Sequence, residues 1–319
     1  MKLSKINQLE LLPTTRILLL GSSGLVGSAF MRHFDKQNFQ HVLACSSINS
    51  DLTNRVATQN LISEFRPDLV IMAAGKIGGI RFNIERTREL FLSNMLMQNN
   101  VLEASSNFRV PQLVFFASSS VYPSLAPQPM SEAMVGSGPL ETVLKAFGTV
   151  KLAGIELMNV INSDSYFNYK TIIAANLYGP NDNFHPTYSH ALQGLMRKIH
   201  TAKLQNDTQI VLWGDGTPMR EFLHSDDLVR ASVLLLNSNC EDQIINVGSG
   251  EEVPILDLAQ SIAKVVKYHG KIHWDTSAPN GSLRRVLDSS KIRDIGWKPT
   301  VSLIDGIKSL YEYYSQKYV

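Results

Sequence analysis

Cysteine is scarce in this chain, which has only Cys45 and Cys240 among its 319 residues. Two cysteines far apart in the sequence do not form a disulfide framework, and no cysteine or histidine spacing typical of a zinc site accompanies them. We therefore expect two reduced thiols, as in a cytoplasmic protein, and no metal ion.

Long apolar runs and an excess of one charge are absent as well. No stretch of about 18 apolar residues appears, so no membrane-spanning helix is predicted. The net charge is +2 and the basic residues are scattered, which argues against a nucleic-acid partner. With 44% hydrophobic residues, the chain can bury a large core as one α/β unit or two closely joined domains.

The first residues also lack an apolar secretory segment, because Lys2, Lys5 and Glu10 interrupt the leucines that precede Pro13. We interpret residues 1–14 as a short extension that is disordered or docks on the rest of the chain, with a helix as the alternative.

Short apolar runs alternate with segments of helical period as far as about residue 180, which is typical of a parallel sheet wrapped by helices. The runs are unalternating and bounded by turn residues, as expected of strands buried on both faces. The sequence therefore predicts a doubly wound Rossmann-type α/β domain over residues 15–180. Its predicted strands are Ile17–Leu20, Val42–Cys45, Leu69–Ala73, Leu113–Ala117 and Thr171–Ala175, and its long helices are Glu85–Ser105 and Val150–Ile161.

The pattern changes after Tyr178-Gly179-Pro180. Loops there separate a predicted helix, Leu192–His200, from short strands such as Ile210–Trp213. We expect residues 181–319 to form mainly a smaller domain that binds the substrate, with some segments returning to the sheet.

A glycine-rich loop follows the first predicted strand and precedes a predicted helix. In this position the first glycine allows a tight turn, the second lets the backbone approach a pyrophosphate, and the third lets the helix pack on the strand. The amide groups that open the helix favour an anion. The loop therefore predicts a dinucleotide site that includes Gly21, Ser23, Gly24, Leu25, Val26 and Gly27.

The end of the second strand leaves the choice between NAD and NADP open. An acidic residue there would bind the ribose hydroxyls of NAD, and an arginine would bind the 2′-phosphate of NADP. The chain has neither, since Cys45 is followed by Ser46-Ser47-Ile48. Asp51 and Leu52, slightly further along, are placed to meet the adenine.

Several ordered blocks beyond this loop resemble GDP-L-fucose synthase, an extended short-chain dehydrogenase that epimerises and reduces a GDP-4-keto-6-deoxyhexose. The resemblance covers nearly the whole chain from Arg16 onward. The blocks are Ala73-Ala74-Gly75-Lys76-Ile77-Gly78-Gly79-Ile80, Ser118-Ser119-Ser120-Val121-Tyr122-Pro123, Lys151-Leu152-Ala153-Gly154, Asn176-Leu177-Tyr178-Gly179-Pro180, Asp182-Asn183-Phe184-His185-Pro186 with Ser189-His190, Trp213 to His224 with Asp226-Asp227, and Ile245-Asn246-Val247-Gly248.

The resemblance implies roles for residues in these blocks. Ser118 would hydrogen-bond the sugar carbonyl, Lys151 would hold the cofactor ribose, and His190 would exchange protons during epimerisation. A GDP-sugar substrate, a homodimer formed through the two long helices, and NADP(H) in preference to NAD(H) are also implied. Further cofactor contacts are implied for Ala73, Ala74, Asn176 and Leu177, and further substrate contacts for Asn176, Lys198, Trp213, Arg220 and Arg285, where the planar fork of arginine suits diphosphate oxygens.

Two positions depart from the family pattern. The family has a tyrosine four residues before the lysine and a cysteine at the third position of the serine block, where this chain has Phe147 and Ser120. A phenyl ring carries no ionisable proton, and the loss of a positioned general acid costs about 10²–10⁴ in rate. A serine hydroxyl is far less acidic than a thiol, so Ser120 is a poor base unless a neighbour activates it. The family also has Asn-Glu-Pro before its tyrosine, whereas Leu144-Lys145-Ala146 stands here, which favours natural divergence over an engineered change.

Three groups are candidates for the missing proton donor. Tyr188 lies two residues before His190 in the same predicted loop, and Tyr122 follows Ser120 closely. His190 itself titrates in the working range. For both tyrosines the alternative is a packing or structural role.

Three functions are therefore open at this point. The first is an NAD(P)-dependent nucleotide-sugar enzyme that acts by C4 reduction, C3/C5 epimerisation or both. The second is a catalytically silent partner protein that binds a sugar nucleotide or a cofactor, and the third is a non-reductive epimerase in which the nicotinamide is structural or cycles internally.

Overall fold

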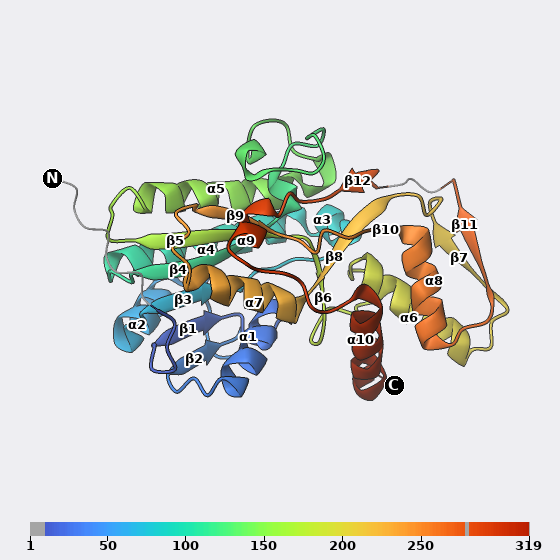
Figure 1. Ribbon diagram of the computed structural model, residues 1–319, viewed down its shortest axis with the longest axis horizontal. Coiled ribbons are helices and arrows are strands. Elements are labelled where there is room, and N and C mark those ends of the chain that lie inside the picture. The colour runs from blue at the N-terminus through green and yellow to red at the C-terminus, as the bar shows by residue number, and fades with distance from the viewer. Residues whose placement is uncertain (1–9, 278–280, 319) are drawn as a thin grey trace.

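A parallel sheet forms the centre of the larger part of the molecule (Figure 1). The computed structural model describes residues 10–277 and 281–318. The strand order β2-β1-β3-β4-β5-β9 changes direction beside β1, which is where ligands bind in open α/β sheets. The strands are β1 (Ile17–Leu20), β2 (Val42–Cys45), β3 (Leu69–Met72), β4 (Gln112–Ser118), β5 (Asn168–Ala174) and β9 (Ile244–Val247).

Helices cover both faces of this sheet because its strands are apolar on both. In β1, Ile17 and Leu19 face one core, whereas Leu18 and Leu20 face the other. The doubly wound α/β fold predicted from the sequence is thereby confirmed. The first core is closed by α1 (Leu25–Lys36) and α7 (Ser225–Leu236), and the second by α2 (Arg55–Phe65), α4 (Thr87–Asn107) and α5 (Lys145–Ile161).

The single long helix predicted over Glu85–Ser105 is wrong at its start. The chain forms a short helix, α3 (Ile80–Glu85), and then α4, with Arg86 between them at φ −118° and ψ 23°. Local hydrogen bonds accompany the break, since the Thr87 hydroxyl donates to carbonyl groups of the preceding turn. Helix α5, in turn, begins at Lys145 rather than at Val150, so Phe147 lies in its first turn.

The smaller part of the molecule lies at one end of the sheet and has its own apolar core (Figure 1). Its helices are α6 (Ala191–Leu204), α8 (Ile255–Val266) and α10 (Leu303–Tyr318), and β7 (Gln209–Trp213) pairs with β11 (Lys271–Asp275). A further sheet is built on β8 (Met219–His224), which pairs with β6 (Asn176–Tyr178), β10 (Glu252–Pro254) and β12 (Arg284–Arg285).

The chain crosses between the two parts more than once, because α7, β9 and α9 (Ser290–Asp294) return to the larger part. Near the start of the chain, Leu11 is buried and its amide donates to the side chain of Asn237, 2.8 Å away. The rest of the predicted extension, residues 1–9, lies outside the described residues.

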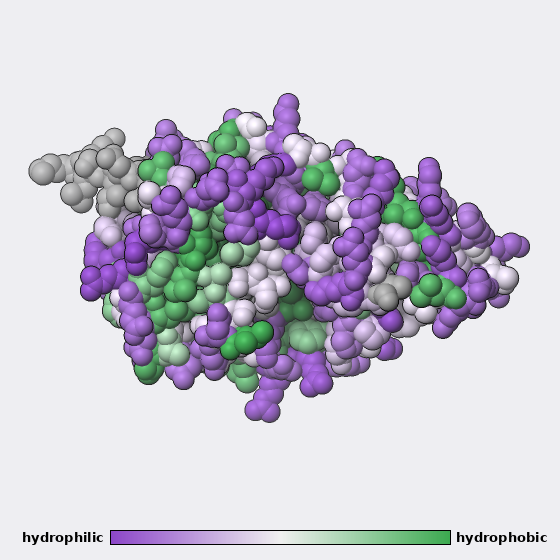
Figure 2. All heavy atoms as spheres, turned by 90° about the horizontal axis from the view of Figure 1, so that it is seen from below, coloured by the Kyte–Doolittle hydropathy of each residue, from purple (hydrophilic) through white to green (hydrophobic). Residues whose placement is uncertain are grey.

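The surface of the molecule is mixed in polarity. Figure 2 shows the face seen from below, where hydrophilic side chains predominate and apolar ones gather mainly in the left half of the view. In the part of the chain that the structure describes, no helix is long and apolar enough to cross a membrane.

Candidate active site

The glycine loop turns tightly between β1 and α1. Gly21 has φ +89°, and a Cβ atom there would lie 2.6 Å from the amide nitrogen of Ala74. A Cβ atom on Gly27 would lie 2.1 Å from the carbonyl oxygen of Gly21, so α1 packs directly on the turn. Gly24 is the N-cap residue of α1 and makes no side-chain hydrogen bond to the helix. The first amide groups of α1 are therefore not capped by a side chain. These residues fit the pyrophosphate of a dinucleotide.

Other residues predicted to bind the cofactor border the same turn. Ala73 and Ala74 are in contact with Gly21, and Leu25 lies beside Gly179, directly after β6, which carries Asn176 and Leu177. The side-chain amide of Asn176 donates to the backbone carbonyl oxygen of Glu221 at 2.8 Å. The structure therefore brings the glycine loop, the end of β3 and β6 together.

The end of β2 carries no charged side chain that would select between NAD and NADP. The backbone carbonyl oxygen of Cys45 accepts hydrogen bonds from the amides of Gly21 and Ser22 at 2.8 and 2.9 Å. These bonds connect β2 to the glycine loop. Further on, Asp51 is exposed and accepts from Thr53, whereas Leu52 is buried.

The serine block lies at the end of β4. The hydroxyl oxygens of Ser118 and Ser120 are 2.8 Å apart, and the Ser120 amide donates to the Ser118 hydroxyl at 3.3 Å. Ser120 is buried, so its hydroxyl can orient that of Ser118. Helix α5 lies against this block, because a Cβ atom on Gly148 would lie 2.4 Å from the carbonyl oxygen of Ser120. The block and the first turn of α5, with Phe147, form one group.

Lys151 lies one turn further along α5 and is only 6% exposed. Its ammonium nitrogen is 4.3 Å from the centre of the Phe115 ring and 5.5 Å from the centre of the Phe147 ring. Phe147 and Lys151 thus share one face of the helix, as their spacing predicts. Burial lowers the pKa of Lys151 to about 8, because the charged form loses its hydration.

The loop that carries His190 packs against the start of α3. The Gly79 amide donates to the carbonyl oxygen of Tyr188 at 2.8 Å, and a Cβ atom on Gly79 would lie 2.3 Å from the carbonyl oxygen of Ser189. The Tyr188 hydroxyl donates to the carboxylate of Glu85 at 2.9 Å. His190 directly precedes α6, and burial lowers its pKa, so the imidazole is mostly neutral at neutral pH and suited to accept a proton.

Two arginines from distant parts of the chain are neighbours. Arg220 on β8 and Arg285 on β12 are register partners. Arg285 donates to the carboxylate of Glu141 at 2.7 Å and to the carbonyl oxygen of Ser119. Burial and, after it, the charge of Arg285 lower the pKa of Arg220. Two largely desolvated guanidinium groups, of which Arg285 is paired with the Glu141 carboxylate, leave positive charge for an anion beside the serine block.

Residues 17–248 of the chain match the NAD dependent epimerase/dehydratase family. The chain belongs to that family. It is 39% identical over 306 residues to the putative GDP-L-fucose synthase 2 of Arabidopsis thaliana, covering 96% of this chain and 93% of that protein. It is also 36% identical over 308 residues to the GDP-L-fucose synthase of Escherichia coli (strain K12), covering 94% and 96%.

Solved structures agree with this assignment to the epimerase/dehydratase family. MlghC, a GDP-mannoheptose C4 reductase from Campylobacter jejuni with NADP bound, has a TM-score of 0.87 at 30% identity and covers 96% of this chain and 99% of its own. The resemblance to GDP-L-fucose synthases is confirmed. An NAD(P)-dependent nucleotide-sugar enzyme is therefore favoured over a protein that only binds.

Neither tyrosine considered from the sequence takes the place of the family's phenol at Phe147. The Tyr122 hydroxyl donates to Asn246 at 2.6 Å, its side chain is fully buried, and burial raises its pKa. Tyr122 therefore links β4 to β9 as a structural residue. The Tyr188 hydroxyl is engaged by Glu85 on α3.

Lys198 and Trp213 lie in the smaller part of this epimerase/dehydratase. The Lys198 ammonium donates to the carbonyl oxygen of Val211 on β7. Trp213, at the end of β7, is exposed. The guanidinium group of Arg81 lies over the Trp213 ring, 5.6 Å from the ring centre. Since Arg81 is on α3, this contact joins the two parts of the molecule.

Sequence reasoning missed three residues that shape the site: Glu141, Arg81 and Glu221. Glu141 is the partner of Arg285, and Arg81 is that of Trp213. Glu221 is fully buried, and its carboxylate accepts from the amides of Gly250 and Leu287 at 2.6 and 3.1 Å. Each acts through a partner far away in the chain. Glu221 stands in the block Trp213 to His224, but nothing in that block identifies its partners.

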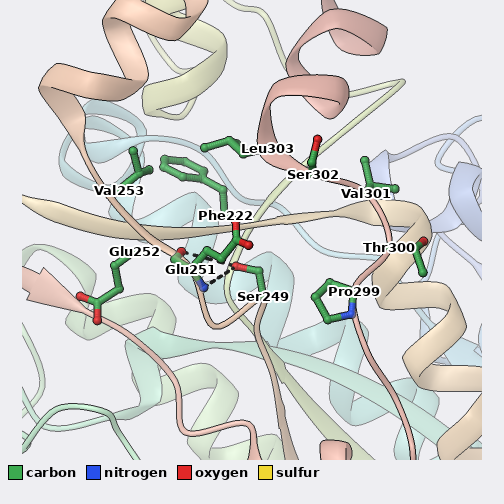
Figure 3. Close-up of a pocket in the computed structure, with 10 residues that line it drawn as sticks. All are labelled: Phe222, Ser249, Glu251, Glu252, Val253, Pro299, Thr300, Val301, Ser302 and Leu303. Atoms are coloured by element: carbon green, nitrogen blue, oxygen red, sulfur yellow. Dashed lines mark hydrogen bonds between the residues drawn. The ribbon is translucent and has the colours of Figure 1, made fainter.

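A cavity of about 410 Å³ lies elsewhere, between β8 and the segment that leads into α10 (Figure 3). It is lined by Phe222, Ser249, Glu251, Glu252, Val253 and residues 299–303, and none of the predicted site residues lines it. Its charged side chains are acidic, and Glu252 is paired with Arg284. A diphosphate would be repelled there, so this cavity is separate from the site described above.

Proposed function

We propose that this chain reduces the C4 ketone of a GDP-linked 4-keto-6-deoxy sugar with NADPH, and that it can also exchange protons at C3 and C5. Residues 15–180 are assigned to cofactor binding and residues 181–319 mainly to the sugar nucleotide. The observation that carries the proposal is the contact between Arg285 and the carbonyl oxygen of Ser119. The proposal is supported because, through this contact, a cationic pair suited to a diphosphate lies near a hydroxyl pair suited to a sugar ketone.

Each group in the site has a task under this proposal. Arg220 and Arg285 hold the diphosphate, and Ser118 donates a hydrogen bond to the ketone oxygen as negative charge develops on it. The glycine loop and Lys151 would hold the nicotinamide cofactor, which when bound would supply the hydride. His190 accepts a proton from carbon during epimerisation, for which its lowered pKa keeps it in the basic form.

We also infer self-association through α4 and α5. Leu92 and Leu96 on α4 and Val160 on α5 are exposed at 49%, 48% and 67%, which is consistent with a helical interface between two copies. The two free cysteines are consistent with a reducing, cytoplasmic setting.

The proposal is tested with the purified full chain, NADPH and GDP-4-keto-6-deoxymannose. We expect NADPH oxidation coupled to formation of a 6-deoxy sugar nucleotide. Without NADPH, deuterium from solvent should enter the sugar at C3 and C5. Deuterium entry with no NADPH oxidation would instead support a non-reductive epimerase. The absence of both reactions would refute the proposal.

A further inference from the structure

The Lys151 ammonium lies among aromatic rings with no acidic partner among the described residues. It lies over the rings of Phe115 and Phe147. The charged side chains on the elements packed against it are engaged elsewhere or exposed. The engaged ones are Glu89 (with Lys76) and Glu103 (with Arg55) on α4, Glu132 (with the Asn246 amide), Glu141 (with Arg285) before α5, and Lys170 (with carbonyl groups of Cys240 and Asp242) on β5. Arg88 on α4 is exposed.

This setting lowers the pKa of the Lys151 ammonium group. On α5 itself, Lys145 and Glu156 are exposed, and burial is the cause that lowers the pKa of Lys151 to about 8. No nearby charge opposes the shift, because a neighbouring carboxylate would have raised the pKa. A lysine with this pKa carries a proton at neutral pH and can release it to a developing alkoxide.

The other groups of the site are less suited to donate. The phenols of Tyr122 and Tyr188 are engaged by Asn246 and Glu85. His190 is mostly neutral at neutral pH, so it lacks the proton to give. Ser118 and Ser120 are hydroxyls of ordinary serine type, which stabilise an alkoxide by hydrogen bonding but do not protonate it.

We propose that Lys151 is the proton donor of the reduction, in the place left by the phenol that Phe147 lacks. The proposal rests on the proposed function. Its geometric basis is that the ammonium nitrogen lies over the Phe147 ring, 5.5 Å from its centre, on the same helix face as the ring that replaces the phenol. The flexible four-carbon stem of lysine lets that nitrogen advance toward the ketone, directly or through one water molecule.

The step is balanced in atoms and charge. As C4 of the sugar gains a hydride, the π electron pair of the C=O bond moves to the oxygen. One N–H bond of the ammonium breaks and an O–H bond forms, which leaves a neutral amine and a secondary alcohol. The amine then regains a proton from solvent. Ser118 and Ser120 orient the ketone oxygen throughout.

The test compares the wild-type chain with Lys151→Arg, Phe147→Tyr and the control Lys145→Arg, an exposed lysine on the same helix. The wild-type kcat should fall as pH rises through about 8, because the acid must be protonated. Lys151→Arg keeps the charge that holds the ribose, so the NADPH dissociation constant should change less than about threefold. Its kcat should drop by about 10²-fold or more, and the fall near pH 8 should disappear.

The two remaining variants sharpen the interpretation. Phe147→Tyr should raise kcat at least about tenfold and move the alkaline fall, because a phenol takes over the donation. Lys145→Arg should keep both the wild-type rate and the wild-type pH profile. A readout independent of turnover is the NMR titration of the Lys151 side chain in the protein without cofactor, expected near pH 8.

The outcomes separate this step from the proposed function. No NADPH oxidation by the wild-type chain would overturn both. Oxidation with the same kcat and pH profile in Lys151→Arg would overturn the role of Lys151 alone. A Lys151 titration at the ordinary value of a lysine would do the same.

Discussion

Ser118, the last residue of β4, and Ser120 illustrate how one side chain can orient another. Ser118 lies at the edge of the sheet, whereas Ser120 is buried and within 2.8 Å of it. In the family pattern the third position of the block is a cysteine, whose thiolate can act as a base. A buried serine hydroxyl bonded to another serine lacks that acidity. We therefore interpret Ser120 as a positioning residue for Ser118.

Substitution of the two serines should separate these tasks. Ser118→Ala removes the donor to the ketone oxygen and should lower kcat/KM by about 10²–10³. Ser120→Ala leaves that donor in place but removes the hydroxyl that orients it. It should lower kcat/KM by about tenfold or less, because a misoriented donor costs less than a missing one. Both are measured by NADPH oxidation with the keto sugar, and the exposed Ser137→Ala serves as the control. Equal losses in the two variants would contradict the positioning role.

The loop between β6 and α6 is held by a buried carboxyl group. Asp182 is 7% exposed and accepts hydrogen bonds from the Asn183 amide at 2.7 Å and from the side chain of Gln193 on α6. Burial outweighs these bonds and raises the pKa of Asp182 to about 7. Because this loop also carries His190, the ionisation of Asp182 affects the element that positions the histidine.

The stability of this loop should therefore depend on pH. The folded-state pKa of Asp182 lies above its unfolded value of 3.8, so its contribution to stability is complete below that value and is lost as pH rises through about 7. Asp182→Asn cannot ionise. Its free energy of unfolding, relative to wild type, should rise by on the order of 2–4 kcal/mol between about pH 4 and pH 8.

Chemical denaturation at several pH values measures this difference. The exposed Asp207→Asn provides the control, whose difference from wild type should stay flat across the same range. A flat difference for Asp182→Asn as well would show that the carboxyl group titrates normally.

Helix α3 was not predicted from the sequence. The predicted long helix began at Glu85, the last residue of α3, whereas α4 begins at Thr87, whose hydroxyl donates to the turn before it. The resulting short helix can bend away from α4. It then carries Arg81 to Trp213 and presents Glu85 to Tyr188. A side-chain bond of this kind competes with the helix only when tertiary contacts favour the bend.

At the scale of the whole molecule, the proposed anion site depends on the meeting of three distant segments. Arg220 comes from β8, Arg285 from β12 near the end of the chain, and Glu141 from the segment before α5. Glu141 partly neutralises Arg285, whereas Arg220 bonds a backbone carbonyl within the described residues and keeps its charge for a ligand. The parallel pairing of β8 with β12 is what sets the two guanidinium groups side by side.

Arg220→Gln should therefore weaken GDP binding by about 10- to 100-fold, since charge-assisted hydrogen bonds to the diphosphate are lost. Titration calorimetry measures the effect, which should shrink as salt is added. Arg284→Gln is the matched control, because Arg284 neighbours Arg285 on β12 but is exposed and paired with Glu252. Comparable weakening in the control would show that the effect is one of general charge.

The sequence by itself determined the α/β class, the strands of the parallel sheet, the glycine loop and the family. These follow from patterns between near neighbours: apolar runs, glycine spacing and short ordered blocks. Only the tertiary structure decided that Lys151 lies over two rings with no counter-ion among the described residues, that Ser120 bonds to Ser118, and that Arg220 meets Arg285. The physical reason is that burial and charge pairing depend on segments that are far apart in the chain and adjacent only after folding.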